Sequence, residues 1–390
     1  MITVSQAREQ LFTLIGPLPG EQVPLAQAAG RVLCADAVAQ RDQPPFAASS
    51  MDGYAMKADE VEQDAKFKVI GEAAAGRRFS GRVGPGQAVR IFTGAPVPDG
   101  ADFVVIQEDI SRSGDLITII EHPDAKDNIR PLGVDFGVGT TLSAPRLLRP
   151  EDVALLAAMN IPRVSVTRKP VVALISNGDE LIMPGETPGP DQIIASNTFG
   201  LKALLEGMGA SVRMLPIARD TVLSLKTAFD LAEGADLVVT IGGASVGDHD
   251  LVGQVATDLG LDRAFYKVLM RPGKPLMAGH LNGAAMVGLP GNPVSAMVCG
   301  YIFIAPMVRA MLGLGTDIAP LLTAPLTQDL AANGAREHYM RARIADGQVT
   351  VFDDQDSSLL TVLAQANALV VRPPKDSARG AGDSVDYMAI

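Results

Sequence analysis

The sequence predicts a multi-domain protein of the α/β class, with separate small β domains. From Val171 to Leu289, strand-like apolar runs alternate with helix-like runs, which is typical of a parallel sheet covered on both faces. On either side of this region, short β-rich runs are separated by Gly and Pro, which is typical of small all-β domains. The chain of 390 residues exceeds what one hydrophobic core usually supports, so we expect two to four domains.

The elements predicted before residue 170 are short. The segment 42–55 is too polar and too broken by Pro and Gly to predict a regular element. Apolar periodicity predicts helices over 4–15 and 151–159, a short helix and then a strand over 25–33, and strands over 67–70, 88–92, 103–107 and 116–120.

The central region carries longer elements with clearer boundaries, and the last part of the chain returns to short strands. The central strands are predicted over 171–176, 212–217, 236–241, 265–269 and 285–289, with helices over 196–208, 221–233 and 251–259. The later strands are predicted over 337–344, 348–352, 368–372 and 385–388.

The composition excludes several classes of protein. A net charge of −11 disfavours non-specific binding to nucleic acid, and the absence of Trp removes one common platform for stacking bases. No Cys/His cluster has metal-ligand spacing. The two cysteines, Cys34 and Cys299, lie far apart in the sequence, and Cys299 is expected to be a buried free thiol because it lies in an apolar run.

Neither a secretory signal nor a membrane span is predicted. Residues Met1–Glu9 are polar and lack the apolar stretch of a signal peptide. The longest apolar run, 294–308, is shorter than the roughly 20 residues that a membrane span needs. It also contains Ser295 and Pro306, so we expect a buried, kinked helix and a cytoplasmic protein.

Carboxylates follow the first two central strands. In an open α/β sheet, ligands bind at the carboxyl ends of the strands. Asp179 and Glu180 follow the strand 171–176, and such a pair would suit a hard cation such as Mg²⁺, although a solvated acidic turn explains it equally. Asp220 follows the second strand, where it would also serve as the N-cap of the next helix.

The glycine-rich segment Gly242–Asp250 follows the strand 236–241. Glycines let a backbone approach a ligand closely, and the next helix start favours negative charge, so phosphate binding is the natural function. The same segment matches G-x-S-x-G around Ser245, the pattern of a serine hydrolase. That alternative would need His280 or His338 as its base, and nothing in the sequence marks His280. Ser245 also lies four residues past Ile241 and not in an abrupt strand-to-helix turn.

Two further turns offer groups that bind anions. In Arg271-Pro272-Gly273-Lys274-Pro275 the prolines stiffen a turn that carries two cations, as a small oxyanion site requires. In the segment 290–295, Asn292 and Pro293 are typical of a helix start, near which Ser295 would offer donors. Five strand ends therefore direct donors, cations and carboxylates toward one edge of the sheet.

At this point six motifs, in the same order, resemble the MoeA family of molybdopterin molybdenumtransferases, which includes the E domain of gephyrin. Together they cover nearly the whole chain. They are Ser50–Ala55, Thr93–Pro98, Ser176–Leu181, Gly242–Asp250, Arg271–Pro275 and Gly288–Ser295.

The resemblance implies an L-shaped homodimer with four domains in each subunit. These would be an extended dimerisation domain (1–46 and 137–168), an inserted small β domain (47–136), a central MogA-like three-layer α/β domain with a parallel sheet (169–312) and a C-terminal β-barrel (313–390).

The resemblance also implies a reaction and its partners. Molybdate would enter adenylylated molybdopterin with the help of Mg²⁺, and AMP and the finished molybdenum cofactor would leave. A molybdopterin adenylyltransferase and downstream molybdoenzyme chaperones would be partners. A non-catalytic scaffold that binds the pterin is the alternative from another class.

Individual site residues follow from the matched motifs. Arg271 stands where the family commonly has a lysine, which changes the geometry of its contact. Asp179 and Asp248 are weaker candidates. The implied catalytic residues are Asp52, Thr93, Asp135, Glu180, Asp220, Asp250 and Lys267, of which Glu180, Asp220 and Asp250 would hold the metal. The implied binding residues are Gly242, Gly243, Ser245, Gly247, Arg271, Lys274, Pro275, Pro290, Pro293, Ser295 and Arg336.

Overall fold

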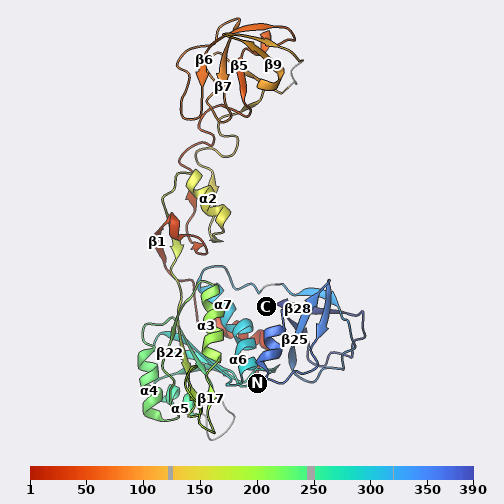
Figure 1. Cartoon of the computed structure of the whole chain (residues 1–390). Helices are drawn as coiled ribbons and strands as arrows, with labels where there is room; N and C mark the ends of the chain where they lie inside the picture. Colours follow the sequence, from red (N-terminus) through yellow and green to blue (C-terminus); the bar gives the residue numbers. More distant parts are fainter. Residues whose placement is uncertain (122–125, 244–250, 319) are drawn as a thin grey trace. The chain divides into compact units, whose positions relative to one another are not determined.

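The computed structural model describes residues 1–121, 126–243, 251–318 and 320–390 (Figure 1). Two compact units are present. Unit 1 comprises Met1–Glu21, Gly30–Cys34 and Val166–Ile390, and unit 2 comprises Gln22–Ala29 and Ala35–Ser165.

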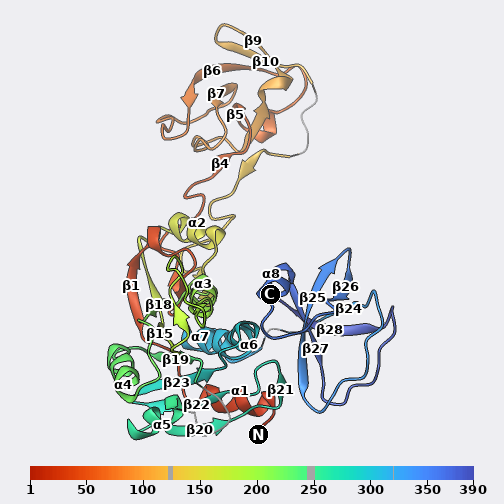
Figure 2. The same cartoon turned by 60° about the horizontal axis from the view of Figure 1, so that its bottom comes forward.

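The centre of unit 1 is a six-stranded sheet (Figure 2). Its four strands β18, β15, β19 and β23 run parallel, but β22 runs antiparallel to β23 and β20. The sheet is therefore mixed: the predicted parallel arrangement is confirmed for β18, β15, β19 and β23, and it is wrong for β22. In spatial order the strands are β18 (Ser211–Met214), β15 (Val171–Ser176), β19 (Leu237–Ile241), β23 (Ala284–Leu289), β22 (Met277–Leu281) and β20 (Asp262–Tyr266).

The antiparallel strand β22 was missed although its turn is visible in the sequence. Asn282 and Gly283 have φ of 51° and 82°, and the pair joins β22 to β23 as a two-residue hairpin turn. Strand β20 was predicted over 265–269 but ends at Tyr266, where Lys267 takes a φ of 69°. The chain leaves the extended conformation there, before the cationic turn begins.

Helices cover both faces of this sheet, as predicted. Val172 and Leu174 of β15 pack in one apolar cluster with α1 (Val4–Thr13) and α3 (Asn197–Gly207), whereas Ala173 and Ile175 pack in another. The second cluster includes α4 (Val222–Leu231) and α5 (Leu251–Asp258). Successive residues of a strand point to opposite faces, so a strand buried on both faces is apolar along its whole length.

The long apolar run forms a buried helix, as predicted, and a π-helical turn lies in its middle. It consists of α6 (Pro293–Cys299), the π-helical turn η4 (Gly300–Ile304) and α7 (Ala305–Met311). Pro306 has no N–H to donate to the carbonyl of Ile302, and Arg8 Nε donates to that carbonyl at 3.2 Å. Among the described residues it is the one helix apolar and long enough to cross a membrane, but 78% of its most apolar window is buried inside the protein.

Both cysteines are free. Cys299 is buried, as expected, and burial raises the pKa of its thiol, while Cys34 is exposed.

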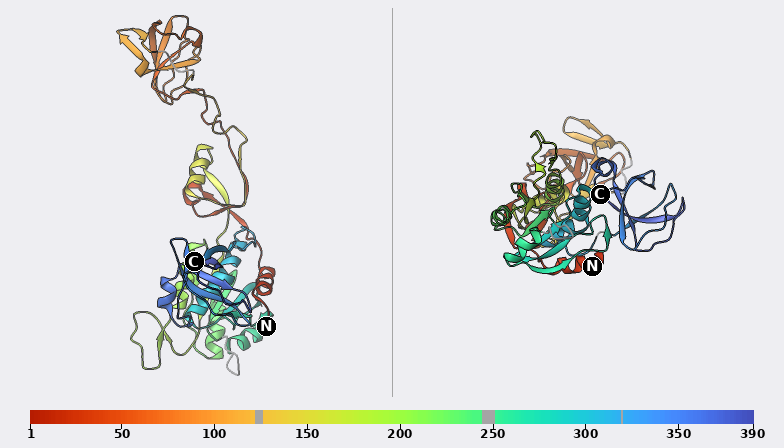
Figure 3. Two further views of the ribbon diagram at one scale, coloured as in Figure 1. Left: turned by 90° about the vertical axis from the view of Figure 1, so that its right-hand side faces the viewer. Right: turned by 90° about the horizontal axis from the view of Figure 1, so that it is seen from below.

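The C-terminal part of unit 1 is a second sheet (Figure 3). Leu326, which directly follows strand β24 (Leu322–Pro325), forms a β-bridge with Val349 of strand β26 (Gln348–Val351), so these two outer strands lie side by side. Strand β21, which carries Arg271, joins this sheet by pairing with β25. The order is β21 (Met270–Arg271), β25 (Glu337–Ala345), β27 (Ala368–Arg372), β28 (Ser384–Ala389) and β24 (Leu322–Pro325), with β26 (Gln348–Val351) also on β25 and the helix α8 at Leu360–Gln365.

Unit 2 contains a six-stranded sheet, and one of its strands corrects a prediction. Strand β5 (Gly53–Met56) is fully buried, although the segment 42–55 was judged too broken for a regular element. A Cβ on Gly53 would lie 2.0 Å from Val105 O, so the glycine that suggested a break allows close strand approach. The sheet order is β8 (Phe103–Ile106), β5, β7 (Gln87–Ile91), β6 (Lys66–Ala73), β10 (Leu116–Ile119) and β9 (Ile110–Ser113).

The remaining elements are short. They are β1 (Gly20–Pro24), η1 (Leu25–Gln27), β2 (Val32–Leu33), β3 (Ala37–Val38), β4 (Ala48–Ser49), η2 (Ala58–Glu60), η3 (Gln107–Asp109), β11 (Ile129–Arg130), β12 (Thr141–Leu142), β13 (Arg146–Leu147), α2 (Pro150–Ala158), β14 (Arg163–Thr167), β16 (Leu181–Ile182) and β17 (Ile193–Ile194).

Candidate functional site

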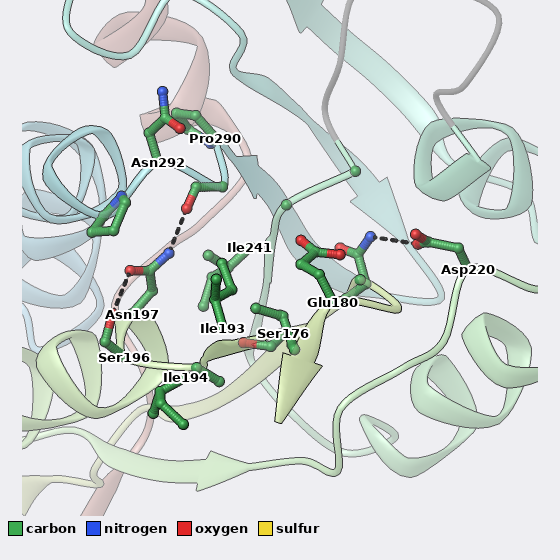
Figure 4. A pocket seen from close by; sticks show the side chains of 18 of the residues that line it. Ser176, Glu180, Ile193, Ile194, Ser196, Asn197, Asp220, Ile241, Pro290 and Asn292 are labelled. Atoms are coloured by element: carbon green, nitrogen blue, oxygen red, sulfur yellow. Dashed lines mark hydrogen bonds between the residues drawn. The ribbon is translucent and has the colours of Figure 1, made fainter. Parts of the chain in front are cut away.

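A cavity of about 920 Å³ opens at the carboxyl ends of β15, β19 and β23 in unit 1 (Figure 4). Its lining mixes polar groups with the exposed side chains of Ile193 and Ile194. Of the predicted site residues, the cavity brings together Glu180, Asp220, Gly242, Gly243, Pro275, Pro290 and Pro293.

The two carboxylates of the cavity come from neighbouring strand ends. Gly178 has a φ of 147°, and a Cβ there would lie 2.5 Å from the Glu180 carboxylate, so glycine lets Glu180 fold back over the turn. Asp179 faces the second strand end, where its Oδ1 accepts from the backbone N–H of Asp220 at 3.2 Å. Asp179 thus supports Asp220 and is not itself among the lining residues.

The side-chain amide of Asn177 lies next to the Asp220 carboxylate, and it can be placed in two orientations. In one orientation its nitrogen donates to Asp220 Oδ1 at 3.3 Å, and its oxygen faces two carbonyl oxygens. In the opposite orientation the nitrogen donates to the carbonyls of Ile241 and Gly242, at 3.2 and 3.0 Å. We assign the second orientation, because it makes two hydrogen bonds in place of one. The amide oxygen then faces the Asp220 carboxylate.

Two oxygens that face each other without a hydrogen between them suit a cation. The donor set of Glu180, Asp220 and the Asn177 amide oxygen is made only of oxygen atoms, which Mg²⁺ prefers, and Mg²⁺ usually keeps several water ligands as well. The described part of the chain has no group of three His, Cys, Asp or Glu side chains that would hold a metal. The third predicted carboxylate, Asp250, lies outside the described residues.

The glycine turn after β19 is sterically required. Gly242 and Gly243 have φ of 95° and 66°, and a Cβ on Gly243 would lie 2.3 Å from Val252 Cγ2. Only glycine fits here, and the bare backbone forms part of the cavity wall. The predicted residues Ser245, Gly247 and Asp248 lie outside the described residues, so the loop and the serine-hydrolase alternative stay predictions.

The predicted cations do not line this cavity. Arg271 lies on β21 of the second sheet, and Arg336 lies just before β25 with its Nη1 3.5 Å from Met270 O. Lys274 follows Arg271 in the same turn. Lys267 places its ammonium 4.8 Å from the centre of the Tyr266 ring, a cation–π contact. Ser295 is buried in the first turn of α6 and is not a lining residue either.

Two of these cations, Arg271 and Arg336, lie near His338, which sequence reasoning had not assigned a role in this site. His338 is 7% exposed, and burial first, then the nearby charges of four arginines, lowers its pKa to about 4. A neutral imidazole keeps a fifth positive charge out of the cluster. The arginines are Arg271, Arg336, Arg341 and Arg372.

The depressed pKa of His338 predicts a pH-dependent stability. The unfolded chain takes up this proton near pH 6.5 and the folded chain only near pH 4, so the stability from neutral His338 is lost as pH falls through this window. The loss at pH 4 should approach about 3 kcal/mol. It is measured by urea unfolding between pH 7 and pH 4.5, where aspartates with an unfolded pKa near 3.8 contribute little.

Comparison of two variants isolates this contribution. His338→Phe should flatten the dependence on pH, whereas His280→Gln should retain it because His280 is exposed on β22. An equal slope for His338→Phe and the wild-type chain would show that another group titrates.

In unit 2 the structure brings together two of the three predicted residues. Asp52 Oδ1 accepts from the N–H and the hydroxyl of Thr93, both at 2.8 Å. The backbone hydrogen bond, followed by the hydroxyl, holds the pKa of Asp52 below its usual value. Asp135 is exposed, and its N–H donates to Gln43 O.

Several lining residues carried no recognisable signal in the sequence. Ser358 lies in a polar stretch without a motif, yet it lines the cavity. Asn197 donates from its amide to Gly291 O at 2.7 Å and so joins two walls of the cavity. Neither has a local pattern that sets it apart from a surface residue.

Three family descriptions match successive parts of the chain: the MoeA N-terminal region (domain I and II) at residues 2–160, a probable molybdopterin binding domain at 173–310, and the MoeA C-terminal region (domain IV) at 323–390. The molybdopterin molybdenumtransferase of Nostoc sp. is 34% identical over 99% of this chain and 93% of its own length. That of Haemophilus influenzae is 33% identical over 99% and 98%. A crystal structure of the molybdopterin biosynthesis MoeA protein of Pyrococcus horikoshii superposes with a TM-score of 0.85 at 27% identity, over the whole of both chains.

Proposed function

Because this chain belongs to the MoeA family of molybdopterin molybdenumtransferases, we propose that it inserts molybdenum by a reaction of molybdate with adenylylated molybdopterin that releases AMP. The observation that carries the proposal is the cavity itself. It combines two carboxylates, an amide oxygen and a bare glycine backbone at one sheet edge, and its volume of about 920 Å³ suits a large conjugated ligand.

The lining groups suit the two chemical parts of such a substrate. The apolar side chains of Ile193 and Ile194 offer a surface for a flat ring. Glu180 and Asp220 would hold Mg²⁺, which when bound would neutralise phosphate charge. The residues Ser245, Gly247 and Asp250, which follow the glycine turn, are proposed to complete the phosphate side.

Molybdate, the second substrate, is a dianion and needs fixed cations. We propose that Arg271, Lys274 and Arg336 bind it together with Ser295. The lowered pKa of His338 supports an excess of positive charge next to Arg271 and Arg336. Attack on a phosphorus of the pyrophosphate, by a molybdate oxygen or by water, would break a P–O bond and release AMP. No covalent bond to the enzyme is required.

The remaining expectations are proposals of the same kind. The chain would work in the cytoplasm as a homodimer, with Asp52, Thr93 and Asp135 acting on the partner subunit's cavity. A molybdopterin adenylyltransferase would supply the substrate. Lys267 is proposed as a catalytic residue, for which its cation–π contact with Tyr266 provides a fixed position.

Reconstitution of an apo-molybdoenzyme tests the proposal. The chain, adenylylated molybdopterin, Mg²⁺ and molybdate should together restore activity and release AMP in step with it. Labelling of Ser245 by a serine-reactive phosphonate would instead support the serine-hydrolase alternative. A chain that binds the pterin but neither uses molybdate nor releases AMP would be a scaffold, and the proposal would be wrong.

A further inference from the structure

Arg219 lies between the two turns that carry the carboxylates of the cavity. Its Nη1 donates to two carbonyls, Asp179 O at 3.1 Å and Leu181 O at 3.3 Å. These carbonyls lie on either side of Glu180 in the sequence, and Asp220 is the residue after Arg219. A single guanidinium nitrogen therefore joins the backbone around one carboxylate to the segment that carries the other.

The turn that carries Glu180 depends on these two hydrogen bonds. The N–H of Leu181 donates to Gly178 O at 3.3 Å, and the N–H of Ile193 donates to Glu180 O at 2.8 Å. The main chain thus pairs two carbonyls of the turn, and Arg219 pairs the two others. Without Arg219, only water would be left to pair with them, so the turn would lose contacts that fix its shape.

The first turn of α4 fixes the position of Arg219. The N–H of Arg219 donates to Ser224 Oγ at 2.9 Å, and Arg219 O accepts from the N–H of Thr221 at 2.7 Å. Thr221 is the N-cap of α4, and its hydroxyl accepts from the N–H of Ser224 at 3.2 Å. The start of the helix therefore holds Arg219 at both its N–H and its carbonyl.

The neighbours of Arg219 also contact the same turn. Ala218, the residue before it, accepts at its carbonyl from the N–H of Gly178 at 3.1 Å. Asp220, the residue after it, donates its N–H to Asp179 Oδ1 at 3.2 Å. Contacts at three successive residues therefore set the position of one carboxylate relative to the other.

The charge of Arg219 opposes the proposed metal. Arg219 is exposed and makes no ion pair in the described part of the chain. A positive charge close to the site repels a divalent cation, so the charge by itself lowers the affinity for Mg²⁺. Geometry acts in the opposite direction, because Mg²⁺ demands near-ideal octahedral geometry and its carboxylate ligands must be held in place. Charge and geometry therefore predict opposite effects when Arg219 is removed.

We propose that Arg219 is a positioning residue, which holds Glu180 and Asp220 in the relative positions that a divalent cation needs. It contacts neither the metal nor the nucleotide. The identity of the metal rests on the proposed function, whereas the link between the two turns follows from the hydrogen bonds alone.

Binding of Mn²⁺ to the full chain tests the proposal, measured as the loss of the electron paramagnetic resonance signal of free Mn²⁺. Mn²⁺ takes the same oxygen ligands as Mg²⁺, which should displace it. The site is identified as the binding that Asp220→Ala removes. Arg219→Ala should weaken this binding about tenfold or more, the usual effect of removing a residue that orients a metal ligand.

Three further variants separate position from charge. Arg219→Lys keeps the charge and places an ammonium near the nitrogen that bonds, so its affinity should lie between the wild-type and alanine values. Ser224→Ala changes no charge but removes the acceptor of the Arg219 N–H, and it should also weaken binding. Lys226→Ala is the matched control: it removes an exposed cation of α4 that makes no hydrogen bond in the described structure, so binding should not weaken.

Hydrogen exchange gives a second measurement, which does not depend on the metal. In Arg219→Ala the peptide 177–182 should exchange faster than in the wild-type chain, because its turn has lost two hydrogen bonds. The peptide 197–207, which covers α3, should exchange as in the wild-type chain. This comparison separates a loosened turn from general unfolding.

The outcomes are separable. Unchanged or tighter Mn²⁺ binding in Arg219→Ala would overturn the proposal, and so would unchanged exchange in 177–182. If the wild-type chain binds no Mn²⁺ that Asp220→Ala removes, the proposed metal site fails. The exchange of 177–182 alone then decides whether Arg219 holds the two turns together.

Discussion

Replacing Asp220 by alanine is expected to lower the rate of AMP release by about 100-fold or more. Asp220 and Glu180 are the two carboxylates of the cavity, and the Asn177 amide oxygen faces Asp220. Without Asp220 the oxygen donor set loses a full charge, and a divalent cation loses one of its two carboxylate partners. The rate is measured with adenylylated molybdopterin and molybdate over a range of Mg²⁺ concentrations.

The dependence on Mg²⁺ distinguishes a metal ligand from a merely structural residue. For a ligand, a higher concentration of Mg²⁺ should recover part of the rate. Asp230→Ala is the control, because Asp230 is an exposed carboxylate on the neighbouring α4 and should leave the rate unchanged. A rate within twofold of the wild-type value for Asp220→Ala would contradict the site assignment.

Replacing Asp376 by alanine is expected to destabilise the chain by about 3 kcal/mol or more. Arg372 is 2% exposed and its Nε donates to Asp376 Oδ2 at 2.5 Å, while Arg379 Nη2 donates to Oδ1 at 2.8 Å. Removal of Asp376 leaves the guanidinium of Arg372 buried without its counter-charge. The free energy of unfolding is measured with urea at pH 7.

The loss of stability in Asp376→Ala should come from the buried, unpaired guanidinium of Arg372, rather than from the lost attraction between the two charges. Replacing both partners, as Arg372→Met with Asp376→Leu, should therefore recover most of the stability. Asp386→Ala removes the same charge at an exposed position of β28 and should stay within about 0.5 kcal/mol of the wild-type value. Equal losses for Asp376→Ala and Asp386→Ala would rule out this explanation.

The ion pair of Arg372 with Asp376 also affects the charge around the proposed molybdate site. Arg372 is one of the four arginines that lower the pKa of His338. Asp376 neutralises Arg372, whereas Arg271 and Arg336 make no ion pair in the described part of the chain. The positive charge next to His338 therefore comes from Arg271, Arg336 and Arg341, and the first two are proposed to bind molybdate.

The sequence by itself determined the elements whose signal is local. The apolar run 171–176 predicted β15 with its observed bounds, and the run 294–308 predicted the buried helix that α6, η4 and α7 form. The positions of Glu180, Asp220 and Gly242 followed from the rule that ligands bind where parallel strands end. The six motifs predicted the family.

Some errors were local and could have been avoided. The pair Asn282-Gly283 is a common hairpin signal, and it would have predicted β22 and the mixed sheet. Gly53 was interpreted as a break, but its missing side chain is what lets β5 approach Val105. Glycine tolerates both unusual φ angles and close backbone contacts. At Gly283 this allows a turn, and at Gly53 it allows two strands to approach closely, so the neighbouring strands decide which structure forms.

Other features exist only in the tertiary structure. Arg341 lies 14 residues from Gln355, and Ser357 lies 65 residues from Asn292, yet hydrogen bonds join each pair. His338 has an ordinary sequence context, and its pKa is lowered by burial and by arginines from three segments. Periodicity and motifs report only what a residue's near neighbours impose. Burial, charge and hydrogen bonding at the site depend on distant segments that packing brings together, so only the fold could reveal them.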